Sequence, residues 1–216
     1  MKRIAALLLV LALCFACFGC DKGRINVPPD GPDGESETGE QGGTDLNHLM
    51  PVAVFTMDGG AQFEVELYKE TAPKTVENFT KLIKSGFYDG TLIHRIASGN
   101  IHIIQSGGEF LGEDNNRYSK YSDAIFGEFA VNGFDNGLSH TEGVISMART
   151  SDFNSASSQF FICFGDSTDL DGDYAAFGRV RKGMDVILEI SETPRLGDAP
   201  LENIIIEKVT LKYVSK

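Results

Sequence analysis

Residues 143–164 read GVISMARTSDFNSASSQFFICF and contain two short apolar runs, 144–148 and 159–164, on either side of a polar segment. Apolar runs of this length, bounded by Gly, Asn, Asp and Ser, are typical of buried β-strands. Comparable runs occur elsewhere in the chain, at 92–96, 101–105, 175–180 and 204–214. Many short strands separated by turn residues predict a mainly β fold, either a barrel or a sandwich.

The segment before these runs predicts a hairpin and a helix. Residues 52–56 and 61–67 flank a glycine-containing turn, and the second run alternates between apolar and polar positions, as a half-buried strand does. Apolar residues at helical spacing between Pro73 and Gly86 predict an amphipathic helix. Residues 183–190 predict a second, shorter helix.

Composition and charge exclude several classes of function and of fold. The chain has 216 residues, enough for one ordinary domain, and a formal net charge of −12, which repels nucleic acid. Three of its four cysteines lie in the first twenty residues, and Cys163 stands alone in an apolar run. We therefore expect no nucleic-acid partner and no disulfide framework, and we expect Cys163 to be a buried core thiol.

The first twenty residues predict export and lipid attachment. Lys2-Arg3 precedes an apolar run, 4–18, that is too short for a comfortable membrane span and is typical of a secretion signal. The run ends in Gly19-Cys20-Asp21, which resembles a bacterial lipoprotein signal. The resemblance implies cleavage after residue 19 and a lipid on Cys20, with Cys17 as the other candidate. An ordinary cleaved signal or an uncleaved anchor is the alternative.

A polar segment follows the leader. Residues 21–45 are rich in Gly, Pro, Asp, Glu, Ser and Thr and cannot bury enough apolar surface to fold. As a flexible coil this segment would span on the order of 25–30 Å. We therefore divide the chain into a lipoprotein signal peptide at 1–19, a lipid-anchored flexible linker at 20–46 and a folded domain at 47–216.

Metal and nucleophile chemistry find no support in the sequence. The four histidines lack metal-ligand spacing, and no second cysteine lies near Cys163. The acidic turn at 169–173 has its glycine in the wrong place for a calcium loop. No metal and no cofactor are expected.

Five blocks of sequence occur in a fixed order. They are GFYDGTLIHR at 86–95, IIQSGG at 103–108, GVISMAR running on to SQFFI at 143–162, LDG with AAFGRV at 170–180, and GMDV at 183–186. Together these blocks resemble the cyclophilin family of peptidyl-prolyl cis/trans isomerases, here in a bacterial lipoprotein form. The resemblance covers residues 52–214 and implies a closed eight-stranded antiparallel β-barrel capped by two α-helices.

The resemblance also implies an activity and its residues. The family accelerates rotation about the peptide bond that precedes proline, so the partners would be proline-containing polypeptides. Arg95 matches the catalytic arginine, whose permanent charge and planar donors can stabilise a twisted prolyl amide. Gln105 would orient Arg95 or the substrate backbone, and Gln159 and Ala148 would hold the peptide chain.

The implied proline pocket contains one marked departure from the family pattern. The residues assigned to the pocket are His102, Ile103, Met147, Phe161, Leu170 and Tyr174. His102 stands where the family commonly has Phe, and the segment from Arg95 to Gln105 is two residues longer than usual. Either His102 points into the proline site, or the insertion turns it outward and a neighbouring Ile fills the site. Without the resemblance, Met147 and Phe161 are simply core residues.

The sequence as a whole predicts a monomeric, lipid-anchored isomerase on the extracytoplasmic face of a bacterial membrane, where it would assist the folding of exported or surface proteins. The main alternative is a lipid-anchored module that binds proline-containing segments, or a chaperone, with little turnover. A solute-binding lipoprotein is a third possibility, although such proteins usually need two lobes and a longer chain. The presence of Arg95, Gln105, Met147, Gln159 and Phe161 favours the enzyme.

Overall fold

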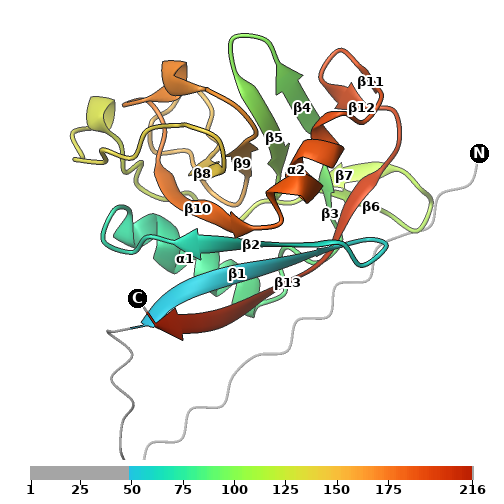
Figure 1. Ribbon diagram of the computed structural model, residues 1–216, viewed down its shortest axis with the longest axis horizontal. Coiled ribbons are helices and arrows are strands. Elements are labelled where there is room, and N and C mark those ends of the chain that lie inside the picture. The colour runs from blue at the N-terminus through green and yellow to red at the C-terminus, as the bar shows by residue number, and fades with distance from the viewer. Residues whose placement is uncertain (1–48, 216) are drawn as a thin grey trace, which may run out of the picture. The chain divides into compact units, whose positions relative to one another are not determined.

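Residues 49–215 are described by the computed structural model, whose strands and helices are labelled in Figure 1. The strands are β1 (Leu49–Met57), β2 (Gln62–Leu67), β3 (Thr91–Ile93), β4 (Arg95–Ser98), β5 (His102–Ser106), β6 (Glu109–Leu111), β7 (Arg117–Ser119), β8 (Val144–Met147), β9 (Phe160–Cys163), β10 (Ala176–Lys182), β11 (Arg195–Leu196), β12 (Ala199–Pro200) and β13 (Ile204–Ser215). The helices are α1 (Pro73–Lys84) and α2 (Met184–Ser191), and two 3-10 turns lie at Ala130–Asn132 and Thr168–Leu170. The predicted mainly β architecture with two helices is confirmed.

The predicted closed barrel of eight strands is wrong. Among the described residues, eleven antiparallel strands form one sheet in the open order β4-β5-β9-β8-β10-β2-β1-β13-β3-β6-β7, and β11 and β12 form a separate hairpin. The ladder does not close because the chain changes partner at His94. Residues 91–93 pair with β13, whereas residues 95–98 pair with β5, and His94 belongs to neither ladder.

Helix α1 forms where the apolar spacing predicts it. Pro73 occupies the first turn, where its missing N–H costs nothing, and Gly86 follows the end with φ of +69°. The buried face consists of Thr75, Val76, Phe79, Leu82 and Ile83. Residue 72, at the N-cap, is an alanine, which provides no capping side chain.

A distant carboxylate takes the place of the missing cap. Glu128 is fully buried and accepts hydrogen bonds from the backbone N–H groups of Lys74 (3.0 Å) and Thr75 (2.8 Å). These are unpaired donors of the first helical turn, and a negative charge is favourable there. The loop that carries Glu128 is thereby fixed to α1.

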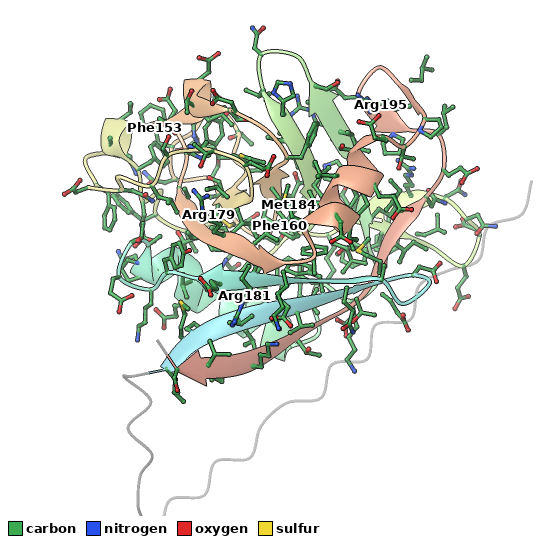
Figure 2. The ribbon with its side chains drawn as sticks, in the orientation of Figure 1. Phe153, Phe160, Arg179, Arg181, Met184 and Arg195 are labelled. Carbon is green, nitrogen blue, oxygen red and sulfur yellow. The ribbon has the colours of Figure 1, made fainter. Side chains whose placement is uncertain are left out.

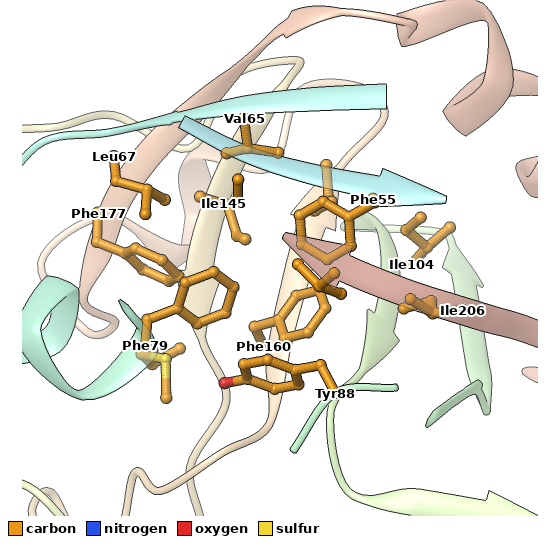
Figure 3. Packing of buried hydrophobic residues seen from close by; sticks show 14 of the residues in the cluster. Phe55, Val65, Leu67, Phe79, Tyr88, Ile104, Ile145, Phe160, Phe177 and Ile206 are labelled. Atoms are coloured by element: carbon orange, nitrogen blue, oxygen red, sulfur yellow. The ribbon is translucent and has the colours of Figure 1, made fainter. Parts of the chain in front are cut away.

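Aromatic rings fill the centre of the core (Figure 3). Phe79 of α1 packs against Tyr88 and Phe177 with 4.9 Å between ring centroids, and edge-on against Phe160 at 5.5 Å. Phe55 and Phe63 stack at 4.5 Å across the β1–β2 pair. The sheet and α1 therefore share one apolar core.

The second helix begins at a glycine that no other residue could replace without strain. Gly183 has φ of +77°, and a Cβ at this position would lie 2.5 Å from the carbonyl oxygen of Gln62. The backbone of β2 thus approaches the start of α2 closely, and α2 also contacts β5. The predicted helix at 183–190 is confirmed at Met184–Ser191.

The predicted signal peptide at 1–19, Cys20 and the linker at 20–46 lie outside the described residues. Within 49–215, no helix combines the length and the apolar character needed to cross a membrane.

Candidate active site

Arg95 is the first residue of β4, and side chains from two other elements hold its guanidinium group. Nε donates a hydrogen bond to Oδ2 of Asp198 at 3.0 Å, and Nη1 donates one to Oε1 of Gln105 at 3.3 Å. Gln105 lies directly opposite Arg95 in the β4–β5 register. The strand pairing therefore brings together two residues that are ten positions apart in the sequence.

The hydrogen-bond chain continues to Gln159. Nε2 of Gln105 donates to Oε1 of Gln159 at 2.8 Å, which leaves the Gln159 amide nitrogen free to donate to another group. Gly108 makes this arrangement possible, because a Cβ there would lie 2.8 Å from Cγ of Gln159. Arg95, Gln105 and Gln159 thus form one polar row across β4, β5 and the start of β9.

Beside this row lies a cavity of about 250 Å³, which we call the apolar pocket. Its lining residues are Arg95, Ile101, Ile103, Gln105, Ala148, Arg149, Phe161, Leu170 and Tyr174. Phe161 and Tyr174 meet edge to face at 5.6 Å, and Phe161 and Ile103 are almost fully buried. A cavity with apolar walls and a few convergent donors at one edge is suited to an apolar ring attached to a polar chain.

The structure places His102 outside the apolar pocket. Its ring packs edge-on against Phe164, and its Nδ1 lies 3.1 Å from the carbonyl oxygen of Asp166. Ile101 lines the pocket instead, which corresponds to the alternative in which the insertion turns His102 outward. The physical reason is strand alternation, because neighbouring residues in β5 point to opposite faces and Ile103 already faces the pocket.

Met147 is also absent from the pocket lining. Its side chain is 1% exposed and belongs to the main core, as the reading without the family resemblance predicts. Of the remaining predicted substrate-binding residues, Gln105, Ile103, Ala148, Phe161, Leu170 and Tyr174 line the apolar pocket, and Gln159 lines the hollow beside it.

A second hollow of about 430 Å³ adjoins the apolar pocket. Gln105, Ala148 and Arg149 line both spaces, so the two could hold neighbouring residues of one chain. Polar side chains and the exposed ring of Tyr121 form much of the second hollow.

Sequence reasoning assigned no role to Arg149, although its side chain lies between the two spaces. Its guanidinium carbon lies 4.6 Å from the ring centroid of Tyr174 and about 5 Å from those of Phe129 and Phe153. Nε donates to the carbonyl oxygen of Asp173 at 3.0 Å. Figure 2 shows Phe153 on the loop that precedes β9. In the sequence, the one sign of such a role is an arginine directly after an apolar strand. Which aromatic rings surround its guanidinium group becomes apparent only in the fold.

A buried histidine supports the floor of the apolar pocket. His140 is 1% exposed and stacks on Phe161 with 5.8 Å between ring centroids. Nδ1 lies 2.8 Å from Oδ1 of Asp171, and Nε2 lies 3.0 Å from Oγ of Ser146. The carboxylate can only accept, so Nδ1 carries the proton and Nε2 accepts from Ser146. Burial lowers the pKa of His140 despite the opposing effect of Asp171, so its neutral form is favoured.

Cys163 lies on β9 beneath the pocket and is fully buried. Burial raises its pKa to about 12, which suppresses the reactive thiolate. The prediction of a buried core thiol is confirmed. Within residues 49–215 no group of three His, Cys, Asp or Glu side chains is placed to hold a metal ion.

The family model described as cyclophilin type peptidyl-prolyl cis-trans isomerase/CLD matches residues 52–211. The chain belongs to the cyclophilin family. A peptidyl-prolyl cis-trans isomerase of Acinetobacter baylyi is 40% identical over 136 residues, which are 61% of this chain and 67% of that protein. Peptidyl-prolyl cis-trans isomerase cypE of Dictyostelium discoideum is 39% identical and covers 68% of this chain and 88% of its own length.

A solved cyclophilin confirms the kinship of the fold. The crystal structure of a Cryptosporidium parvum cyclophilin type isomerase in the presence of the dipeptide Ala-Pro matches with a TM-score of 0.57 and 28% identity, covering 74% of this chain and 98% of that one. This cyclophilin is accordingly a peptidyl-prolyl cis-trans isomerase, and its substrates are polypeptides that contain proline.

Proposed function

We propose that Arg95 catalyses the isomerisation by stabilising the twisted prolyl amide. The observation that carries the proposal is that Arg95, held by Gln105 and Asp198, lies at the edge of an apolar pocket. Proline's ring would enter the pocket, and the peptide bond before it would lie against the guanidinium group. The solved relative with Ala-Pro supports a proline-directed site in this fold.

The chemistry needs no bond to be made or broken. Rotation about a peptide bond meets a barrier of about 18–20 kcal/mol because the C–N bond has partial double-bond character. In the twisted state this conjugation is lost, and the proline nitrogen regains a lone pair that can accept a hydrogen bond. A fixed cationic donor stabilises the twisted state more than it stabilises either planar state, and that difference in free energy lowers the barrier to rotation.

Gln159 and Ala148 would hold the peptide chain while the bond rotates. Gln105 occupies the Gln159 amide oxygen, so the amide nitrogen of Gln159 can donate to a substrate carbonyl. Ile101, Ile103, Phe161 and Leu170 would fix the proline ring by apolar contact. Rotation would then be confined to the part of the chain on one side of the bond.

We also propose that this cyclophilin is a monomeric lipoprotein of a bacterial membrane, attached through Cys20 on the extracytoplasmic face. The support is the sequence of the leader, Gly19-Cys20-Asp21 after an apolar run, and the polar segment that follows. Two acyl chains anchor a protein stably where one is marginal. Its clients would be exported or surface proteins that fold near the membrane.

The decisive experiment compares Arg95→Ala with the parent in the full-length, detergent-solubilised chain. The rate of cis-to-trans exchange of a proline-containing tetrapeptide should fall at least about tenfold, which corresponds to about 1.4 kcal/mol of lost transition-state stabilisation. Arg117→Ala, which removes an exposed arginine on β7, is the matched control and should keep the parent rate. Equal turnover in Arg95→Ala and the parent would show that Arg95 is not catalytic.

A further inference from the structure

Asp198 holds Arg95 from a hairpin 103 residues away in the sequence. Strands β11 and β12 enclose a two-residue turn, Gly197-Asp198, and Gly197 has φ of +60°, as the first turn position of such a hairpin requires. Figure 2 shows Arg195 on this hairpin. The turn places the Asp198 carboxylate against the Nε side of the Arg95 guanidinium group.

The position of the hairpin does not depend on the Asp198 carboxylate. The backbone N–H of Ile96 donates to the carbonyl oxygen of Asp198 at 2.8 Å, which fastens the turn to β4. Arg195 donates to Oγ of Ser98 at 2.6 Å and to the carbonyl oxygen of Ser191 at 2.7 Å. The side chain of Asp198 can therefore be changed while the hairpin stays in place.

We propose that Asp198 is a positioning residue that fixes the plane of the Arg95 guanidinium group for catalysis. An arginine side chain has a long flexible stem, and one hydrogen bond leaves its fork free to swing about that contact. Asp198 and Gln105 provide two acceptors from different elements, one for Nε and one for Nη1. With both in place, about three of the five guanidinium N–H bonds remain for the substrate.

The carboxylate has little other role in the fold. The ion pair is well exposed, with 39% of the Arg95 side chain and 51% of the Asp198 side chain accessible, and exposed pairs contribute little to stability. Preorganised donors, by contrast, affect the rate directly because they need no rearrangement as the amide twists. Loss of Asp198 should therefore change turnover and leave the free energy of unfolding nearly constant.

The inference rests on the proposed role of Arg95, and the kinetic test uses three variants of the full-length chain. Asp198→Ala should lower kcat for a proline-containing tetrapeptide about three- to tenfold with little change in KM. Asp198→Asn keeps an oxygen acceptor without the charge and should retain most of the parent kcat. Glu202→Ala removes a carboxylate from an exposed residue of the following segment and should match the parent.

A double-mutant cycle separates this inference from the function on which it rests. If Asp198 acts through Arg95, Asp198→Ala should have no further effect on the rate in an Arg95→Ala background. An equal loss in both backgrounds, or a full kcat in Asp198→Ala while Arg95→Ala is impaired, would overturn the positioning role alone. Full turnover in Arg95→Ala would remove the proposed function and this inference together.

A spectroscopic measurement tests the same contact without relying on activity. The ¹⁵Nε–H resonance of Arg95, assigned by its absence in Arg95→Ala, should shift and exchange faster with water in Asp198→Ala. It should stay unchanged in Glu202→Ala. An unaltered resonance in Asp198→Ala would mean that the carboxylate does not hold the arginine in solution, and the inference would be wrong.

Discussion

His140 is a single residue whose titration should be visible in the stability of the domain. Burial lowers its pKa below the ordinary value, which is about 6.5 in the unfolded chain. Below that pH the unfolded chain binds a proton that the folded chain does not, so acidification favours unfolding until the pH reaches the folded pKa. The contribution is fully present above about pH 6.5 and reaches at most about 1.4 kcal/mol for each unit of pKa difference.

We therefore expect the free energy of unfolding in urea to fall between pH 7.5 and pH 5.5, and to fall less in His140→Gln. The groups that face His140 are Asp171, Ser146, Phe161 and Tyr174. The pKa of Asp171 is lowered below 3.8, because the hydrogen bonds from Ser139 and His140 outweigh its burial, so it titrates below this window.

The pKa of His94 is also lowered by burial, so His94 contributes in the same direction. His94→Gln is the matched variant, and the effects of the two substitutions on the pH slope should add. An identical fall in the parent and in His140→Gln would contradict the prediction for His140.

The family resemblance predicted individual site residues correctly only where the side chain faces the site, as the resemblance assumes. Arg95 and Gln105 face each other, as the resemblance implies. His102 and Met147 do not line the pocket, and residue type could not predict this, because it does not show which face of a strand a side chain occupies. Asp198 could not have been predicted, because no local pattern near it indicates a contact 103 residues away.

Among the elements, helix α1 depends on an acceptor supplied from outside the helix. Glu128→Gln would keep one oxygen for the N–H groups of Lys74 and Thr75 and would place an amide donor where the second oxygen now accepts. We expect a loss of about 1–3 kcal/mol in the free energy of unfolding, because a buried N–H group would lose its partner. Glu77→Gln, on the exposed side of α1, is the control and should stay within about 0.5 kcal/mol of the parent.

Urea unfolding followed by circular dichroism provides the measurement for both substitutions. Parent-like stability in Glu128→Gln would show that water or another group can satisfy these donors.

The bounds of α1 could be predicted from the apolar spacing, Pro73 and Gly86, which are local signals. Its cap lies more than fifty residues away and has no counterpart in the local sequence.

At the scale of the whole molecule, the proposed anchor predicts where the enzyme is found. Cys20→Ala should abolish labelling by a fatty-acid probe and move the protein from the membrane to the soluble fraction, with the same isomerase activity per molecule. Cys17→Ala is the control and should remain labelled and membrane-bound. If labelling persists in Cys20→Ala and is lost in Cys17→Ala, the lipid is attached to Cys17.

The mainly β class of the molecule could be predicted from the sequence, but whether its sheet closes into a barrel could not. Apolar runs and turn residues indicate where the longer buried strands lie, because those features are local, but they gave no sign of the short strands β6, β7, β11 and β12. Whether the sheet closes depends on one break in the chain, at His94 between β3 and β4, and His94, within an apolar block, carries no signal that the chain changes partner there.

Because Cys163 is buried, chemical modification of its thiol can report transient local opening of the domain. It is the only thiol after position 20, and its buried side chain packs with Ala97, Ile103 and Phe161. An alkylating reagent can modify it only when the residues packed around it move apart. The rate of modification therefore records how often the packing beneath the apolar pocket opens, in the unaltered enzyme and without any introduced label.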